Sequence, residues 1–345
     1  MNHRYWIPLA ALAGVIGLTF LAAVSVTGQT PPAPAKSAAK AAGAPRTPWG
    51  DPDLQGTWFV LYDVPLERSA ANAGKQFLSD QEVAKADAAK GLNPGRNARA
   101  AEGSAQDVSG AYNAVFNSVL KTGRRTSMII DPPDGKIPPL VPGVTPFTQG
   151  FPGGGRGGFL GNGPGQNDNP ETIAQSPRCL GVPMPFLPLN TLFAQGTVMQ
   201  VVQSPKSMAI YMEDDHAGGG NRVIFMDGRP HAPKSAKFYL GDSRGHWEGN
   251  TLVVETTNFS QGFRGSDIET YKMIERFTRV DANNLRREIT FDDPKTWTRP
   301  WTVQIDMGRA PENKHMIFDS ACHEGNYGIV GILVGNRKQE QAEKK

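Results

Sequence analysis

Three histidines lie in polar segments, where an imidazole is available for chemistry. His216 follows three acidic residues, His231 follows an Asp-Gly-Arg-Pro turn, and His323 stands between Cys322 and Glu324. Imidazole suits proton transfer near neutral pH and metal binding. Brought together, His216, His231, His323 and Glu324 would form an acid–base pair or hold a divalent metal. The structural alternatives are a solvated turn for His216 and a packed loop for His231.

Asp242 and Arg244 share a polar turn ahead of a strong strand pattern. We predict that Asp242 acts with His231, His323 and Glu324 as a catalytic residue. The alternative is that Asp242 pairs with Arg244 and only shapes the turn. No histidine pair has the His-x-His or His-x-x-x-His spacing of a local zinc site, so the identity of any metal is unknown. The residues expected to bind ligand are His216, Arg229, Arg244, Trp297, Trp301 and Asn326.

Two glutamates, Glu255 and Glu275, fall inside strand patterns. A carboxyl group that is buried without a partner has a raised pKa and can act as a general acid. The structural alternative is an ion pair with an arginine of the neighbouring pattern, Arg276 or Arg287.

Aromatic residues are spread over neighbouring strand patterns, at Tyr239, Tyr271, Phe291, Trp297 and Trp301. A barrel interior lined by aromatic rings with a few polar groups suits a small organic or sugar-like ligand. The alternative is that these rings fill a packed core.

The two cysteines, Cys179 and Cys322, are predicted to form one disulfide, because disulfides persist in exported proteins. It would join the segment after a glycine-rich stretch to the polar segment around His323. Free thiols or a metal–thiolate site are the alternatives.

We expect a series of strands in the second half of the chain to position these candidate site residues. Short turns separate the strands, which is typical of an antiparallel meander that closes into a lipocalin-like barrel or a curved sandwich. Residues 246 and 247 lead into one of these strands. The strand patterns cover residues 198–203, 208–213, 223–226, 251–257, 271–280, 285–291, 301–307 and 315–319.

The first half of the chain predicts a few short helices and an opening strand. Ser79 and Glu82 form a capping box before a helix over 81–90, and an apolar stripe predicts a second helix over 111–121. Residues 54–58 end in Gly-Thr-Trp, which is similar to the Gly-x-Trp opening of lipocalin-like barrels.

The N-terminus predicts export. Residues 1–28 have the basic, apolar and small-residue regions of a cleavable signal peptide. If this segment is retained, it is the protein's one expected membrane contact. Residues 29–48 predict a disordered linker, residues 49–337 one β-rich domain, residues 143–170 a flexible insertion rich in glycine and proline, and residues 338–345 a disordered tail.

The charge distribution argues against a nucleic-acid partner. The formal net charge is +3, residues 1–48 carry four cations and no acid, and the tail from Arg337 carries four cations and two acids. The stretch between them therefore has a net charge of −3, and no basic face is concentrated there.

Several motifs resemble an uncharacterised family of exported, β-rich bacterial proteins. They are Thr47–Gly56, Arg125–Ser127, Asp131–Pro139, Gly241–Gly249 (GDSRGHWEG) and Ala321–Gly328 (ACHEGNYG). The resemblance implies a single domain and brings no catalytic residues with it. From the histidines and carboxylates, we expect an exported enzyme, a hydrolase, lyase or isomerase that acts on a small molecule through acid–base chemistry, with or without a divalent metal. The alternative is a non-catalytic, lipocalin-like binding or envelope interaction protein.

Overall fold

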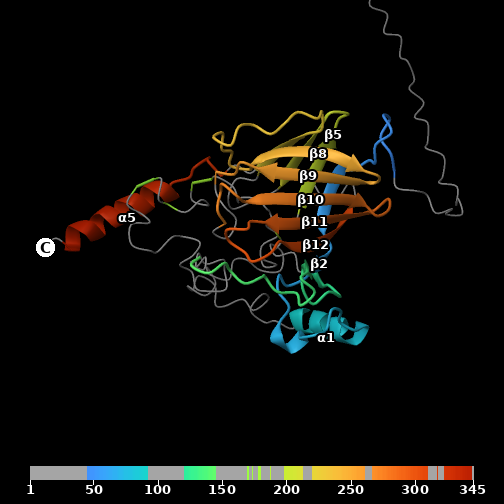
Figure 1. Ribbon diagram of the computed structural model, residues 1–345. Coiled ribbons are helices and arrows are strands. Elements are labelled where there is room, and N and C mark those ends of the chain that lie inside the picture. The colour runs from blue at the N-terminus through green and yellow to red at the C-terminus, as the bar shows by residue number, and fades with distance from the viewer. Residues whose placement is uncertain are drawn as a thin grey trace, which may run out of the picture. The chain divides into compact units, whose positions relative to one another are not determined.

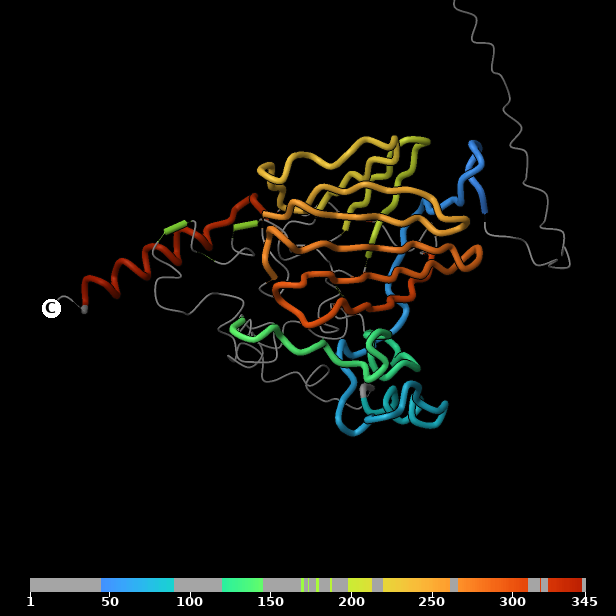
Figure 2. Tube along the Cα trace, viewed as in Figure 1, coloured from blue at the N-terminus to red at the C-terminus, as the bar shows by residue number. Residues whose placement is uncertain are grey.

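The computed structural model describes residues 45–91, 120–144, 198–212, 220–260, 266–309 and 322–343, with residues 169–170, 173, 178–179, 187 and 317. Figures 1 and 2 show the course of the chain. In order, its elements are β1 (Gly56–Val60), β2 (Tyr62–Asp63), η1 (Ala70–Asn72), α1 (Asp80–Gly91), β3 (Lys121–Thr122), β4 (Ile129–Asp131), β5 (Val198–Gln203), β6 (Ser207–Met212), β7 (Gly220–Phe225), β8 (Asp242–Glu248), β9 (Thr251–Thr257), β10 (Lys272–Arg279), β11 (Asn284–Asp292), β12 (Trp301–Arg309) and α5 (Gly328–Glu343).

Nine strands in the described part of the chain close into a barrel. Their order is β1-β5-β6-β7-β8-β9-β10-β11-β12, and β12 pairs back onto β1. The short β4 pairs with the first residues of β12 and extends the sheet there. Figure 1 shows β8 to β12 side by side along one wall. The mainly β, barrel-like fold predicted from the strand patterns is confirmed.

One pairing departs from a simple meander. β7 and β8 run parallel and pair only at Ile224 with Ser243 and at Phe225 with Arg244. Two consecutive strands that run parallel need a connection that leads from the end of the first strand back to the edge of the sheet where that strand began. Residues 226–241, here named the crossover segment, make this connection.

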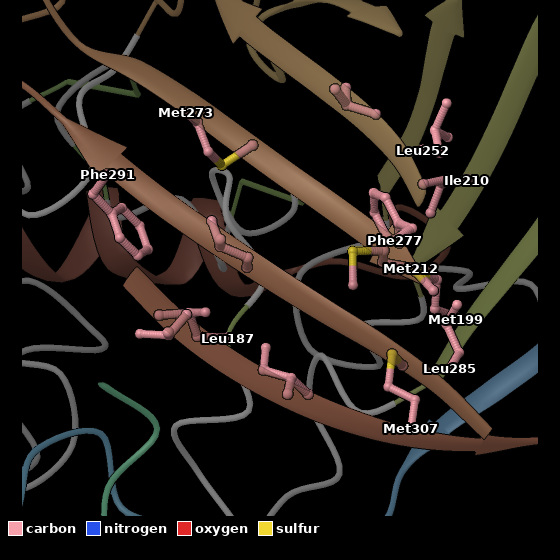
Figure 3. Packing of buried hydrophobic residues seen from close by; sticks show 14 of the residues in the cluster. Leu187, Met199, Ile210, Met212, Leu252, Met273, Phe277, Leu285, Phe291 and Met307 are labelled. Carbon is pink, nitrogen blue, oxygen red and sulfur yellow. The ribbon is translucent and has the colours of Figure 1, made fainter. Parts of the chain in front are cut away.

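The barrel interior follows from the two-residue period of its strands. In β10 and β11, every second residue is buried, because successive side chains of a strand point to opposite faces. Figure 3 shows side chains from several strands, among them Met199, Met273, Phe277 and Leu285, converging on one apolar cluster.

Trp58 of β1 packs in the core of the barrel. It is fully buried, and its indole Nε1 donates a 2.9 Å hydrogen bond to the Leu54 carbonyl. The Arg279 guanidinium lies 4.7 Å from its ring and donates to the carbonyls of Asp53, Asp281 and Ala282. The Gly-x-Trp segment thus lies in β1 and places its tryptophan in the hydrophobic core.

The predicted capping box begins α1. The Ser79 backbone N–H donates to the Glu82 carboxylate at 2.8 Å, and the Glu82 N–H donates to the Ser79 hydroxyl at 3.3 Å. Most of the second predicted helix, residues 111–119, lies outside the described residues. Its expected last residue, Lys121, instead begins β3, which pairs in parallel with β2.

The ends of the chain differ in part from expectation. Residues 1–44, 145–168 and 344–345 lie outside the described part, so the signal peptide and most of the insertion stay predictions. Residues 45–48 of the expected linker instead join a turn, in which Arg46 bridges to Pro52. Residues 338–343, expected as a disordered tail, continue α5, because this stretch of Lys, Gln, Glu and Ala favours a helix. No helix in the described residues combines the length and hydrophobicity of a membrane span.

Candidate functional site

The crossover segment places His231 against the outer face of the barrel. Its Nδ1 lies 3.0 Å from Asp242 Oδ2, at the start of β8, and its Nε2 lies 3.3 Å from Glu255 Oε1 on β9. The Thr257 hydroxyl is 3.3 Å from the same Nδ1. Both ring nitrogens therefore face acceptors, and only the imidazolium form donates to both carboxylates at once.

Asp242 is the anchor of this group. Its carboxylate accepts hydrogen bonds from the Ala232 N–H at 2.8 Å and from the Arg244 guanidinium at 2.5 Å. Burial would raise the pKa of Asp242, but the hydrogen bonds from Ala232, His231 and Arg244 hold that pKa below its ordinary value. The predicted pairing with Arg244 is present, and the group clamps the crossover segment onto β8 and β9.

Gly241 to Gly245 also fits the Gly-x-Ser-x-Gly pattern of serine hydrolases, with Ser243 at its centre. Such a nucleophile sits on a tight turn between a strand and a helix, whereas Ser243 lies inside β8. Its hydroxyl is buried and lies 3.0 Å from the Thr256 hydroxyl. Neighbouring residues of a strand alternate between faces, so Ser243 points inward, away from His231 on the outside.

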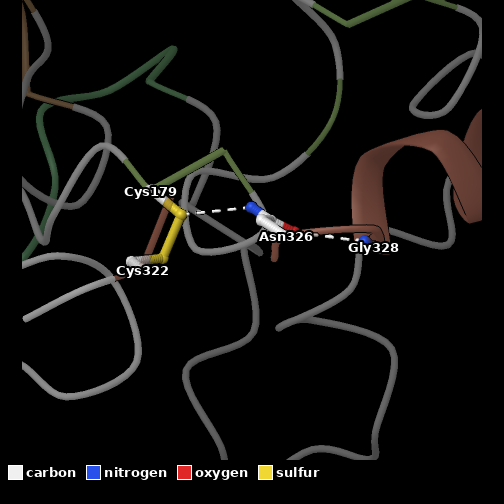
Figure 4. The surroundings of a disulfide bond; sticks show 4 residues. All are labelled: Cys179, Cys322, Asn326 and Gly328. Atoms are coloured by element: carbon white, nitrogen blue, oxygen red, sulfur yellow. Dashed lines mark hydrogen bonds between the residues drawn. A yellow bond between two sulfur atoms is a disulfide. The ribbon is translucent and has the colours of Figure 1, made fainter. Parts of the chain in front are cut away.

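The second predicted catalytic segment is held by the disulfide. Cys179 and Cys322 are bonded, with Cα atoms 5.6 Å apart, which confirms the predicted pairing (Figure 4). His323 and Glu324 next to it are exposed, and neither side chain has a hydrogen bond or ion pair within the described residues. None of the ring contacts of His231 comes from this segment. The structure therefore does not join the two predicted parts of the catalytic site.

Asn326, expected as a ligand contact, has a structural position here. Its side-chain amide donates to Cys179 Sγ at 3.1 Å, and its Oδ1 accepts from the Gly328 N–H at 3.1 Å (Figure 4). It thus connects the disulfide with the first residue of α5.

Trp297 and Trp301 lie in the hydrophobic core. Trp301 stacks on Phe291 with ring centroids 4.0 Å apart, and Trp297 meets Trp301 edge to face at 5.6 Å. Both are at least 97% buried, so the packed-core alternative describes them better than the expected ligand contact.

Two further residues predicted for the site are Arg229 and His216. Arg229 pairs with Asp227 at 2.5 Å and covers the Phe225 ring at 4.2 Å, on an exposed turn. His216 lies outside the described residues. Within the described ranges, no three His, Cys, Asp or Glu side chains are grouped as metal ligands. The divalent metal stays a prediction.

A cluster of three charged side chains lies inside the barrel. Glu275 of β10 is fully buried; its Oε1 accepts from Arg287 Nε at 2.9 Å and NH2 at 2.7 Å, and its Oε2 lies 2.5 Å from Arg222 NH1. β8 and β9 separate β7 from β10, so the Arg222 contact crosses the interior. Burial would raise the pKa of Glu275, but the two arginine charges outweigh it and hold that pKa below its ordinary value.

Sequence reasoning predicted the pair of Glu275 with Arg287 as an alternative and missed Arg222. Arg222 is in phase with the buried Ile224, two residues along β7, and this phase is the signal that would have found it. The signal is weak because Val223, Ile224 and Phe225 are all apolar, and the sequence does not say which of them faces inward.

Arg222 has unused hydrogen-bonding capacity. Its side chain is 5% exposed, and its Nε and NH2 groups have no acceptor among the described residues. Leaving a buried donor unpaired costs about 1–3 kcal/mol, and more for a charged group.

Tyr271 resembles Arg222 in this respect, because its buried hydroxyl also has no partner in the described structure. Burial, with the charges of Glu275 and Asp293, raises the pKa of Tyr271, so this hydroxyl stays a donor.

A cavity of about 410 Å³ lies beside Arg222, where the barrel wall is interrupted. It is lined by Gly220–Val223 of β7 and by Phe238–Gly241 of the crossover segment. The parallel pairing of β7 with β8 begins only at Ile224, so these two stretches remain apart. Gly241 permits the approach of the crossover segment, since its φ is +73° and a Cβ there would lie 2.5 Å from the Thr256 methyl group.

A second hollow, of about 730 Å³, lies between α1 and the outer face of β11 and β12. The arginines of its lining have partners within the protein: Arg124 with Asp80, Arg286 with Asp306, and Arg125 with Gln304. Because their hydrogen-bonding capacity is used within the protein, the cavity beside Arg222 is the stronger candidate.

Comparisons with known proteins add no assignment, because no protein-family model matches the chain and no curated protein is significantly similar to it.

Proposed function

We propose that this protein is exported and binds a small organic molecule in the cavity beside β7 without catalysing a reaction. The observation that carries the proposal is the interrupted wall of a barrel that is otherwise closed. Its cavity of about 410 Å³ falls within the usual range for small-molecule sites, about 300–1,000 Å³.

The lining of the cavity supports a ligand with both apolar and polar parts. Phe238 and Val223 are 43% and 50% exposed, so apolar surface stands at the opening, while Asn221 and Arg222 add polar groups. The interior behind it is rich in methionine: six of the ten methionines belong to the described core. Methionine side chains adapt their shape readily, which favours accommodation of a ligand.

The enzyme expected from the sequence has less support. It required His231 and the Cys322–Glu324 segment to share a mouth, and neither contributes to the cavity lining. His231 is engaged by two carboxylates, which leaves it without a free ring nitrogen for proton transfer. Export is supported by the predicted signal peptide and by the disulfide, since disulfides persist outside the reducing cytosol.

Blocking the cavity tests the proposal. The probes are two fluorescent dyes: uncharged phenylnaphthylamine and anilinonaphthalene sulfonate, the same molecule with a sulfonate. Val223→Trp fills the cavity from its lining, and Val202→Trp on β5 is the matched control, since Val202 is also an exposed strand valine, at 57%, and does not line the cavity. We expect the wild type and Val202→Trp to bind at least one dye, and Val223→Trp to weaken that binding about tenfold or more.

The proposal is overturned if the wild type binds neither dye, or if Val223→Trp binds them as the wild type does. Circular dichroism of both variants establishes that the barrel remains folded.

A further inference from the structure

We propose that the ligand of this cavity carries an acidic group, a carboxylate or a sulfonate, which pairs with the Nε and NH2 edge of Arg222. This inference rests on the proposed function and names the chemical class of the ligand. The inference comes from the cluster of Glu275, Arg222 and Arg287, in which a buried arginine has donors without acceptors among the described residues.

The geometry of the guanidinium group selects this chemistry. Arg222 uses NH1 toward Glu275 and leaves Nε and NH2 without an acceptor in the described structure. These two groups form one edge of the planar fork, and their N–H bonds point the same way. A carboxylate accepts two parallel bonds from such an edge, which a neutral ligand cannot match in strength.

The charge balance of the buried cluster also favours an acidic ligand. Glu275 is shared between Arg222 and Arg287, so a single carboxylate faces two guanidinium groups. A buried cation with an incomplete set of acceptors is unfavourable, and an anion reduces that penalty.

The binding step requires a local movement. The nitrogen atoms of Arg222 are enclosed by protein, although the residue itself lines the cavity. Rotation of the Arg222 side chain toward the opening brings its free edge to the acid. Since the arginine stem has several rotatable bonds, this movement leaves the backbone of β7 in place.

The two dyes test this directly, because they differ only by the sulfonate. We expect wild-type protein to bind anilinonaphthalene sulfonate about 10- to 100-fold more tightly than phenylnaphthylamine. Arg222→Met should remove this preference, so that the folded variant binds the two dyes with nearly equal affinity. Arg276→Met is the matched control: it removes the same charge from the outer face of β10 and should keep the preference.

Arg222→Lys adds a second measurement if Arg222→Met does not fold. It keeps the charge and loses the two-pronged edge, so the preference should fall several-fold without disappearing. Equal affinity of the wild type for both dyes overturns the inference, as does a preference that survives in a folded Arg222→Met protein. In both cases, loss of dye binding in Val223→Trp would leave the proposed function standing. Failure of both dyes to bind the wild type would overturn both proposals.

Discussion

The barrel has two groups of charged side chains, one in its interior and one on its outer face. Each group connects three segments of the chain. The inner group joins Glu275 to Arg222 and Arg287, and the outer group joins His231 to Asp242 and Glu255. In the outer group, water reaches His231 and Glu255, whose side chains are 25% and 44% exposed. In the inner group, no side chain is more than 5% exposed, and two donors of Arg222 lack acceptors.

The difference shows that similar residue types serve different purposes at different depths. Exposed ion pairs contribute little because water competes for both partners, so the outer group serves mainly to position the crossover segment. Buried donors without acceptors are costly, and under the proposed function those of Arg222 are retained because they recognise a ligand. Substitutions in the two groups should therefore have unequal effects.

The largest effect is expected from Glu275→Gln. It leaves two buried guanidinium groups facing a neutral amide, and we expect a loss of about 3–5 kcal/mol in the free energy of unfolding. Glu248→Gln is the control: Glu248 pairs with Arg276 on the outer face of the same wall, where water competes for both partners, so this substitution should lower the unfolding free energy far less. Urea denaturation measures both. Similar losses in the two variants would contradict the contrast between inside and outside.

An intermediate effect is expected from acid. Burial opposes ionisation of Asp242, yet its hydrogen bonds hold its folded-state pKa below the unfolded value of about 3.9. Its contribution is therefore fully present above that value and is lost as pH falls through the lower, folded-state pKa. Between about pH 5 and pH 2, the unfolding free energy of Asp242→Asn should fall less steeply than that of the wild type. Parallel curves would show that the outer group adds no stability.

The smallest effect is expected from the two histidines first considered for catalysis. His231→Ala removes the contacts of a partly exposed ring with Asp242, Glu255 and Thr257 and should cost about 1 kcal/mol in unfolding free energy. His323→Ala removes an exposed side chain and should stay within about 0.5 kcal/mol of the wild type. Neither should change dye binding. Loss of dye binding in both variants would instead support the site predicted from the sequence, formed by His231 and the Cys322–Glu324 segment.

Local patterns determined much of this fold. The strand patterns at residues 251–257 and 285–291 predicted β9 and most of β11, and Ser79 with Glu82 predicted the start of α1. The cysteine count together with the export signal predicted the disulfide. Each of these features depends on neighbouring residues or on simple pairing, so the sequence alone carries them.

Only the tertiary structure decided which charges meet. A strand pattern tells which side chains face inward, but barrel closure sets which of them face each other across the interior. Arg222 therefore reaches Glu275 from a distant strand, and the short parallel pairing of β7 with β8 opens the wall beside it. His231 and Ser243 are placed in the same way. The crossover segment that carries His231 leads directly into β8, which carries Ser243, yet the histidine lies outside the barrel and the serine inside.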